Sequence, residues 1–223
     1  MHNAWRREWT PEDYRLDKAW KNLSMRSSLE LWPCDMVEVF RSDRFRFFLG
    51  SLASALKFQE KCPDLHMVFT MNAEDQPSDG EPPDWAVFFK ERNVLNFRFG
   101  GYDKTNVKPG SPEWLQKKTE FLGIWTDVVG KLHAHAPSSP RPVNVLFHCF
   151  GGVNRSTAAL VAALVSLSMT IEQAVEYVLK ARSGQQCWWN RDYFLPALLE
   201  FEAIHLPHVS PMEAEDGGLE EQA

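Results

Sequence analysis

The chain has few cysteines, no excess of positive charge and no long apolar segment. Four cysteines occur among 223 residues, and their spacing shows no paired pattern of the kind that metal sites or disulfide frameworks use. No apolar run reaches the length of about 18 residues that a membrane span needs, and the first residues are polar. We therefore expect neither a membrane span nor a secretory signal. The sequence favours a reducing compartment, the cytoplasm, with the nucleus as a second location.

The negative charge is concentrated at the C-terminal end. Lysine and arginine number 24 against 30 aspartate and glutamate residues, a formal net charge of −6. Five acidic residues without a compensating base lie in the tail, namely Glu213, Glu215, Asp216, Glu220 and Glu221. Removing these five charges from −6 leaves the body near −1. A near-neutral body disfavours nucleic acid as a partner without excluding it, because nucleic-acid binders normally carry a basic stripe. A local basic patch near the site could still bind phosphate groups, and its members would be Lys104, Lys108, Lys117 and Lys118. The alternative is that these lysines form a solvated rim.

The segment 148–156, His-Cys-Phe-Gly-Gly-Val-Asn-Arg-Ser, is the most informative part of the sequence. The apolar residues 143–147 before it predict a buried strand, and the apolar residues 158–165 after it predict a buried helix. The segment is therefore predicted to be a loop that joins a strand to the N-terminus of a helix. Such a terminus presents unpaired N–H groups and the positive end of the helix dipole, and these together bind phosphate.

The loop combines backbone freedom with a fixed positive charge. Gly151 and Gly152 allow the backbone to turn inward without Cβ clashes. Arg155 adds a planar fork that binds two phosphate oxygens and stays charged at any working pH. The residues predicted to surround a bound phosphate group are Phe150, Gly151, Gly152, Val153 and Asn154.

Cys149 is the predicted nucleophile. The positive field that binds phosphate also lowers a thiol pKa, into the range of about 3.5–7.5 seen for activated cysteines. A thiolate facing a bound phosphoryl group attacks phosphorus and forms a covalent phosphocysteine. Ser156 is placed to hydrogen-bond the sulfur and help it leave in a second step, and His148 is predicted to orient the loop from behind.

At these residues the chain resembles the cysteine-dependent protein tyrosine phosphatase superfamily, and within it the dual-specificity phosphatases. The resemblance covers roughly residues 40–205 and extends to three further segments, 46–55 with its Leu-Gly-Ser turn, 169–178 and 190–195. It implies an α/β domain with a central, mostly parallel sheet flanked by helices. It also implies a metal-independent and cofactor-independent hydrolase that removes phosphate from phosphotyrosine in proteins and, by extension, from phosphoserine and phosphothreonine.

The family supplies a general acid from a loop upstream of the cysteine, and the best match here is Asp103. Residues 94–99 predict a strand, and Asp103 follows at its C-terminal end, the edge where open α/β sheets bind ligands. The separation from Cys149 is longer than the family usually has, and residues 104–110 read as an insertion. The rival carboxylates are Glu113, which also suits the first turn of the helix that follows, and Asp84; Asp127 sits too far along that helix.

Three alternatives concern the substrate and turnover. Asn154 also occurs at this loop position in related RNA 5′-phosphatases, although Asn equally tolerates unusual backbone angles and braces loops. An RNA 5′-end phosphatase and a phosphoinositide phosphatase are therefore rival activities. A phosphate-binding module without turnover is the third alternative, and it requires the insertion to displace Asp103.

Outside the loop, the sequence predicts three regions. Residues 1–39 are rich in tryptophan and are predicted to form short helices packed on the domain, with a docking surface as the alternative. Residues 40–206 form the catalytic domain, with a helix over 111–132 and another that begins at a Thr170–Gln173 capping box and stops near Gly184. Residues 207–223 are predicted to be a disordered acidic tail. The sequence does not indicate an oligomeric state.

For the remaining cysteines and for two histidines, the sequence predicts structural roles. Cys34, Cys62 and Cys187 are predicted to be inert packing thiols, with a resolving partner for oxidised Cys149 as the alternative. His133 and His135 end the helix that begins at 111, where they suit the carbonyls of a helix C-terminus better than a metal.

Overall fold

The computed structural model describes residues 35–71, 85–100, 107, 110–135, 141–182 and 191–206. The predictions for residues 1–34 and 207–223 therefore lie outside the described residues, as do those for Asp84, Asp103 and Gly184.

A five-stranded sheet in the order β1-β2-β5-β3-β4 forms the centre of the described chain. The strands are β1 (Val37–Arg41), β2 (Phe45–Gly50), β3 (Met67–Thr70), β4 (Leu95–Arg98) and β5 (Val143–His148). β2, β5, β3 and β4 are parallel, and only β1 is antiparallel to its neighbour. The predicted mostly parallel sheet is thus confirmed.

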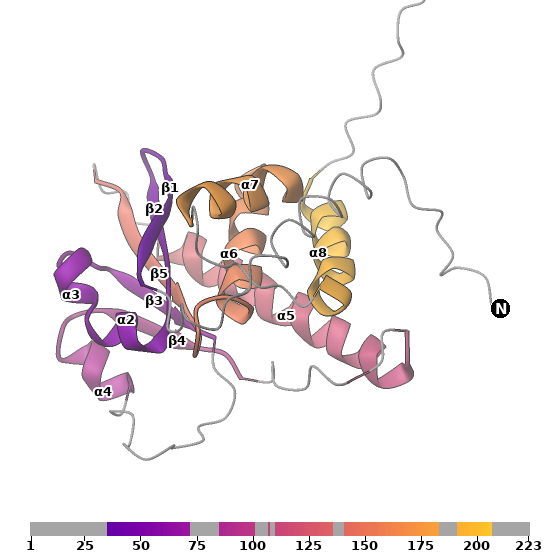
Figure 1. Cartoon of the computed structure of the whole chain (residues 1–223), viewed down its shortest axis with the longest axis horizontal. Helices are drawn as coiled ribbons and strands as arrows, with labels where there is room; N and C mark the ends of the chain where they lie inside the picture. The colour runs from indigo at the N-terminus through magenta and orange to yellow at the C-terminus, as the bar shows by residue number, and fades with distance from the viewer. Residues whose placement is uncertain are drawn as a thin grey trace, which may run out of the picture.

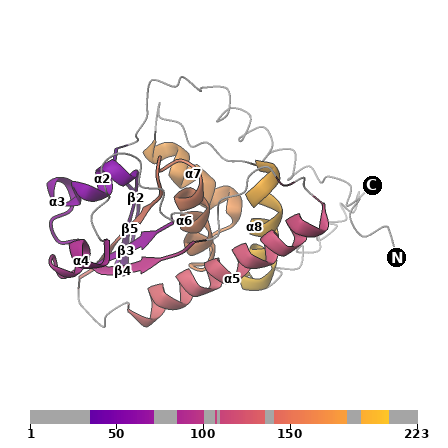
Figure 2. The same cartoon turned by 90° about the horizontal axis from the view of Figure 1, so that it is seen from below.

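Helices cover both faces of this sheet (Figures 1 and 2). On one face lie α2 (Leu52–Leu56), α3 (Phe58–Lys61) and α4 (Trp85–Lys90). On the other lie α5 (Pro112–Ala134), α6 (Arg155–Val165), α7 (Ile171–Ala181) and α8 (Arg191–His205). Two hydrophobic clusters separate accordingly, because side chains of a strand alternate between the faces. Leu146 and Val68 join the α2–α4 cluster, whereas Phe147 and Phe69 join the α5–α8 cluster.

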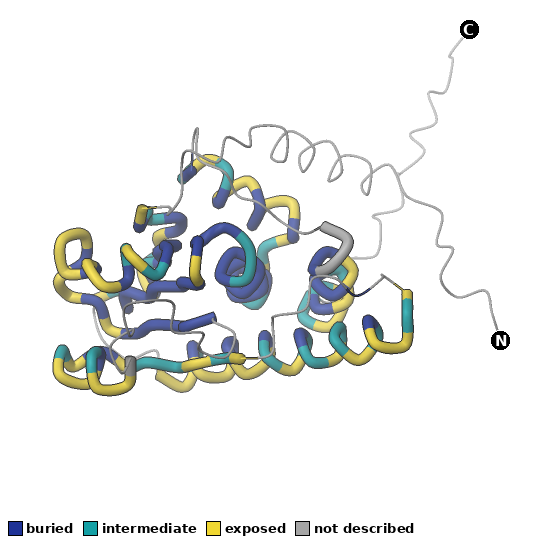
Figure 3. Tube along the Cα trace, turned by 60° about the horizontal axis from the view of Figure 1, so that its bottom comes forward, coloured by how far each residue is buried: buried dark blue, intermediate teal, exposed yellow. Residues whose placement is uncertain are grey.

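β5 and α6 are the most deeply buried elements. Every residue of β5 is buried, as expected for an apolar strand covered on both faces. In α6, residues 156–165 are all buried, so the helix forms the dark centre of Figure 3. A fully buried strand and an almost fully buried helix therefore hold the two ends of the loop.

The other predicted helices are confirmed with small changes at their ends. α5 starts at the Ser111 N-cap, whose hydroxyl accepts a hydrogen bond from the Trp114 N–H (3.1 Å), and runs two residues beyond the predicted end. The Thr170–Gln173 capping box is present at the start of α7. α7 ends at Ala181, three residues before the predicted stop.

Strand β1 was not predicted from the sequence. Residues 37–39, assigned above to the N-terminal extension, belong to this edge strand. The side chain of Ser42 accepts hydrogen bonds from the N–H groups of Arg44 and Phe45, which closes a tight turn into β2. Among the helices that the structure describes, none is long and apolar enough to cross a membrane.

Candidate active site

The predicted phosphate loop connects the last residue of β5 with the first residue of α6. Its base lies at the carboxyl edge of the sheet, because His148 pairs with Gly50 of β2 on one side and Thr70 of β3 on the other. Arg155 is the first residue of α6, so the loop closes on a helix N-terminus as the sequence predicted.

The sulfur of Cys149 receives two hydrogen bonds from the loop. The backbone N–H of Gly152 lies 3.3 Å from Sγ, and the Ser156 hydroxyl lies 3.2 Å from it. The cysteine is only 3% exposed. The sulfur is therefore buried and receives one hydrogen bond from the loop, through Gly152, and one from α6, through Ser156.

These donors stabilise the thiolate. Burial alone raises the pKa of Cys149, but the Ser156 hydroxyl, the backbone N–H groups of Ser156 and Asn154 and the charge of Arg155 outweigh it. The net result is a pKa below the ordinary thiol value. Cys62 shows the opposite behaviour, because burial and the neighbouring Asp64 carboxylate raise its pKa to about 12.

Removing the Ser156 hydroxyl is expected to raise the pKa of Cys149. In Ser156→Ala, the pH profile of iodoacetamide alkylation of Cys149 moves to higher pH, since one donor to the thiolate is lost. Thr157→Val is the matched control. It also deletes a buried hydroxyl of α6, but one without a hydrogen-bond partner among the described residues. An unchanged profile in Ser156→Ala would show that the hydroxyl does not stabilise the thiolate.

The loop is fitted tightly against the Leu-Gly-Ser turn that follows β2. Gly152 has a φ of +72°, and a Cβ there would lie 2.5 Å from the backbone carbon and oxygen of Gly50. The Leu52 N–H donates to the carbonyl of Phe150 at 3.0 Å. The turn between β2 and α2 therefore supports the loop from outside, which explains the glycine at position 152. A Cβ at Gly50 would instead overlap the Ser54 hydroxyl of α2.

Gly152→Ala is expected to destabilise the fold and distort the loop. The positive φ and the steric overlap together cost about 2–4 kcal/mol of unfolding free energy, and phosphate binding is lost with the loop shape. Gly110→Ala separates the two effects, because Gly110 has a φ of +83° but nothing within 4 Å of its Cβ position. That control loses about 1 kcal/mol from backbone strain alone. Equal unfolding free energies for the two variants in urea would refute the role of the Gly50 contact.

His148 lies on the opposite side of the loop base from Cys149. It is fully buried, and its Nε2 lies 2.9 Å from the hydroxyl oxygen of Thr70. Burial lowers the pKa of His148 to about 4, against the opposing effect of a hydrogen bond to the Cys149 backbone. The ring is therefore neutral at physiological pH, and its contact with Thr70 joins the base of the loop to β3.

The other predicted phosphate-binding residues line the loop in different ways. Gly151 and Val153 are buried, whereas the side chain of Phe150, next to the nucleophile, is 57% exposed. Asn154 is the N-cap of α6, with backbone angles of −126° and −80° and no side-chain cap hydrogen bond. The backbone N–H of Asn154 contributes to lowering the pKa of Cys149. This contribution comes from the main chain and does not depend on the Asn154 side chain.

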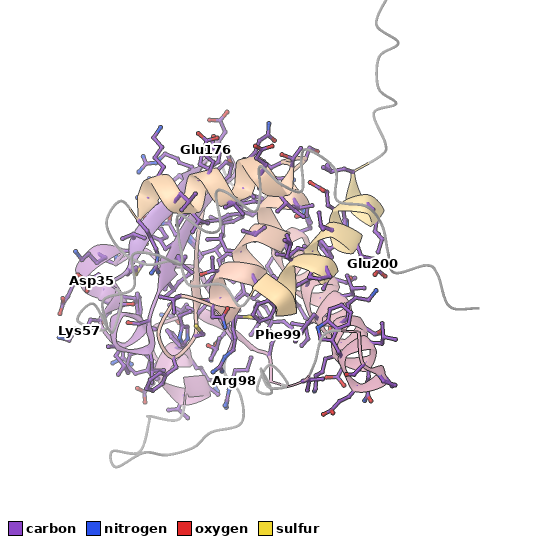
Figure 4. The ribbon with its side chains drawn as sticks, turned by 45° about the vertical axis from the view of Figure 1, so that its right-hand side comes forward. Asp35, Lys57, Arg98, Phe99, Glu176 and Glu200 are labelled. Atoms are coloured by element: carbon purple, nitrogen blue, oxygen red, sulfur yellow. The ribbon has the colours of Figure 1, made fainter. Side chains whose placement is uncertain are left out.

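The predicted acid, Asp103, lies outside the described residues, but the strand before it is described. β4 ends at Arg98, and the Phe99 N–H donates to the carbonyl of Thr70 at 3.0 Å, beside the base of the loop. Arg98 and Phe99 are labelled in Figure 4. β4 thus ends at the edge of the sheet that carries Cys149. Of the rivals, Glu113 is exposed in the first turn of α5, and Asp127 is exposed further along it.

The predicted lysine patch has only two described members, and both are paired with carboxylates. Lys117 contacts Glu120, and Lys118 contacts Glu200 of α8. His135 interacts through Nδ1 with the Lys131 carbonyl at 3.0 Å, as predicted for the end of a helix. No group of three or more His, Cys, Asp or Glu residues that could hold a metal occurs within the described ranges.

This strand-loop-helix arrangement also occurs in solved structures. The chain is similar to the crystal structure of PTPMT1, with a TM-score of 0.54 and 19% identity over 75% of this chain and 93% of that chain. PTPMT1 in complex with PI(5)P gives a TM-score of 0.53 and 21% identity over 73% and 93% of the two chains. The chain has the same fold as these structures. A third structure with this fold is the human tyrosine phosphatase-like serine/threonine/tyrosine-interacting protein (TM-score 0.50, 19% identity, 78% and 99% of the chains). No protein-family model matches the sequence, and comparison with curated proteins finds no match.

Sequence reasoning missed the residues that support the loop. Thr70 and Asn96 sit behind His148, and Gly50 accommodates Gly152. The only sequence signal for the first two is a polar residue within each of two short, largely apolar strands. Such positions are easily assigned to strand ends or surface.

Proposed function

We propose that this protein is a metal-independent phosphomonoester hydrolase that works through a phosphocysteine on Cys149. The observation that supports this most is the environment of the Cys149 sulfur: a buried thiol with a lowered pKa at the N-terminus of α6, hydrogen-bonded by Gly152 and Ser156 and adjacent to Arg155. Such an environment stabilises a thiolate and attracts a phosphate dianion to the same place.

The reaction proceeds in two displacements. The phosphate oxygens bind the loop N–H groups and the Arg155 guanidinium, and the Cys149 thiolate attacks phosphorus as the ester oxygen leaves with its electron pair. A general acid, for which we propose Asp103, protonates that oxygen. Water then attacks phosphorus and gives a proton to the Asp103 carboxylate, which restores the acid. Inorganic phosphate is released as the P–S bond breaks, and the thiolate is regenerated with the Ser156 hydroxyl stabilising its charge.

The role of Asp103 is tested by its dependence on the leaving group. Asp103→Asn is expected to lower kcat by about 10²–10⁴-fold on phosphotyrosine, whose leaving group needs a proton, and far less on an activated aryl phosphate. Glu113→Gln is the matched control and leaves both rates unchanged. A normal rate for Asp103→Asn on phosphotyrosine would reassign the acid while leaving the nucleophile in place.

For the substrate, we propose phosphotyrosine in proteins, extended to phosphoserine and phosphothreonine. Phe150, exposed beside the nucleophile, offers an aromatic surface against which the ring of a phosphotyrosine can pack. A phosphoinositide phosphatase is the second candidate, and the specific observation in its favour is the similarity to PTPMT1 in complex with PI(5)P.

A substrate panel separates these candidates. Wild-type protein is assayed with a phosphotyrosine peptide, a phosphothreonine peptide, a phosphoinositide in vesicles and triphosphorylated RNA. The proposal predicts the highest kcat/KM for the phosphotyrosine peptide. Preference for the phosphoinositide or for RNA would replace the proposed substrate class, and binding without turnover of any would indicate a phosphate-binding module.

A further inference from the structure

Two side chains of opposite charge lie on either side of the phosphate loop. β4 ends at Arg98, which pairs with Thr70 of β3, and Thr70 pairs in turn with His148 at the base of the loop. Thr70 and His148 are buried, whereas Arg98 is exposed. A row of residues that begins at the base of the loop therefore ends in a positive charge, at the sheet edge that carries Cys149.

The negative charge belongs to Asp35, on the opposite side of the loop. Asp35 is exposed and precedes Met36, whose Cα would lie 3.5 Å from a Cβ on Gly50. A Cβ on Gly152 of the loop would in turn lie 2.5 Å from the Gly50 backbone. β1 and β4 are the two edge strands of the sheet, with β5 between them, and Figure 4 labels both Asp35 and Arg98. The loop thus lies between a carboxylate on the β1 side and a guanidinium on the β4 side.

Arg98 lies on the face of the sheet that α2–α4 cover. It follows Asn96 by two residues, and the Asn96 side chain contacts that of Thr70 on this face at 2.9 Å, so alternation places Arg98 there too. Phe150 is held toward the same face, because its carbonyl accepts a hydrogen bond from the N–H of Leu52, the first residue of α2. A phosphotyrosine ring that packs on the exposed Phe150 therefore has Arg98 on the same side of the loop.

The spacing between Arg98 and the loop matches a flanking residue of a peptide. Adjacent strands are about 4.8 Å apart, so the Cα atoms of Arg98 and His148 are about 10 Å apart. An extended peptide advances about 3.3 Å per residue, so a carboxylate about two to four residues from the phosphotyrosine can reach Arg98 while the phosphate occupies the loop. The planar guanidinium is well suited to bind such a carboxylate.

We propose that Arg98 determines substrate specificity by binding a glutamate or aspartate side chain about two to four residues from the phosphotyrosine, and that Asp35 disfavours an acidic side chain on the other flank. The inference rests on the proposed function. It narrows the substrate class to phosphotyrosine peptides that are acidic on one flank, with the two charges setting the direction in which the peptide lies across the loop.

Binding to the Cys149→Ser protein tests this inference without requiring turnover. The probes are phosphotyrosine peptides that carry a single glutamate at one of the four positions before or after the phosphotyrosine. Each is compared with its glutamine counterpart by calorimetry at low ionic strength. On one flank, glutamate is expected to lower Kd by about twofold to fivefold, the usual range for an exposed charge pair. Added salt reduces the difference, because it screens exposed charges.

Variants of the two charged residues assign the preference. Arg98→Ala is expected to abolish the preference for glutamate, and Arg98→Glu to reverse it in favour of lysine at the same position. Asp35→Asn is expected to tighten binding of peptides with glutamate on the other flank. Arg92→Glu is the matched control, because Arg92 precedes β4 at the opposite edge of the sheet, where its guanidinium lies 3.8 Å from the centre of the Phe88 ring. The same charge reversal there leaves the preference unchanged.

Three results would overturn the inference. One is equal binding of the glutamate and glutamine peptides at every position, and another is a preference for glutamate that persists in Arg98→Glu. The third is tighter binding of a bisphosphorylated phosphoinositide in vesicles than of any peptide, lost in Arg98→Ala, which would replace the peptide carboxylate by a second phosphate. Because binding is measured on a protein without the nucleophile, these failures are distinguishable from absence of phosphatase activity, which the substrate panel measures.

Discussion

Cys149→Ser is expected to abolish phosphomonoester hydrolysis while leaving phosphate binding intact. A serine hydroxyl has a much higher pKa than a thiol and lacks the thiolate that the loop stabilises, so kcat falls by at least about 10⁴-fold. The loop N–H groups and Arg155 remain, and the dissociation constant of inorganic phosphate, measured by calorimetry, changes little. The two measurements together separate chemistry from binding.

Cys62→Ala is the matched control for that variant. Cys62 is also a buried free cysteine, but it belongs to the hydrophobic cluster on the α2–α4 face, and its thiol pKa is raised rather than lowered. Its replacement leaves kcat unchanged. Loss of activity in Cys62→Ala, or full activity in Cys149→Ser, would be incompatible with Cys149 as the nucleophile.

Arg155→Lys is expected to lower kcat/KM by about 10²–10³-fold, although the positive charge is kept. The planar guanidinium donates two parallel hydrogen bonds to phosphate oxygens, whereas an ammonium group cannot reproduce this geometry. Arg155→Ala, which also removes the charge, loses more. The measurement is kcat/KM on an aryl phosphate together with inhibition by inorganic phosphate, which weakens in both variants.

Arg44→Lys provides the comparison for Arg155→Lys. Arg44 precedes β2 at the opposite edge of the sheet, and its guanidinium lies 5.3 Å from the centre of the Phe45 ring. The same chemical change there alters kcat/KM by less than about twofold, as for most surface substitutions. Equal effects at the two positions would contradict a phosphate-binding role for Arg155.

The sequence predicts the central loop well because its signals are local. The apolar runs on either side of residues 148–156 determine a buried strand and a buried helix, and both are confirmed as β5 and α6. The glycines, Cys149 and Arg155 could be interpreted from the same segment, because the backbone of the loop and the helix N-terminus that follows it are both local features. The Ser111 and Thr170 caps were also recognised, since a cap involves residues only three positions apart.

The supporting residues could not be predicted in the same way, because their contacts join distant parts of the chain. Gly50 meets Gly152 only once β2 pairs with β5, and Asn96 reaches His148 only through Thr70 of the strand between them. Strand β1 was missed because a short edge strand carries little apolar signal. Asp103 remains a prediction from sequence, since it lies outside the described residues.

Direct detection of the covalent intermediate tests the central proposal most sharply. Ser156→Ala protein, in which loss of the hydroxyl slows release of the thiolate in the second step, is mixed with an aryl phosphate, quenched in acid and digested. We predict a phosphate group on the peptide that contains Cys149, and none on that peptide from Cys149→Ser. Turnover of the substrate with no phosphate attached to Cys149 under these conditions would contradict the phosphocysteine mechanism.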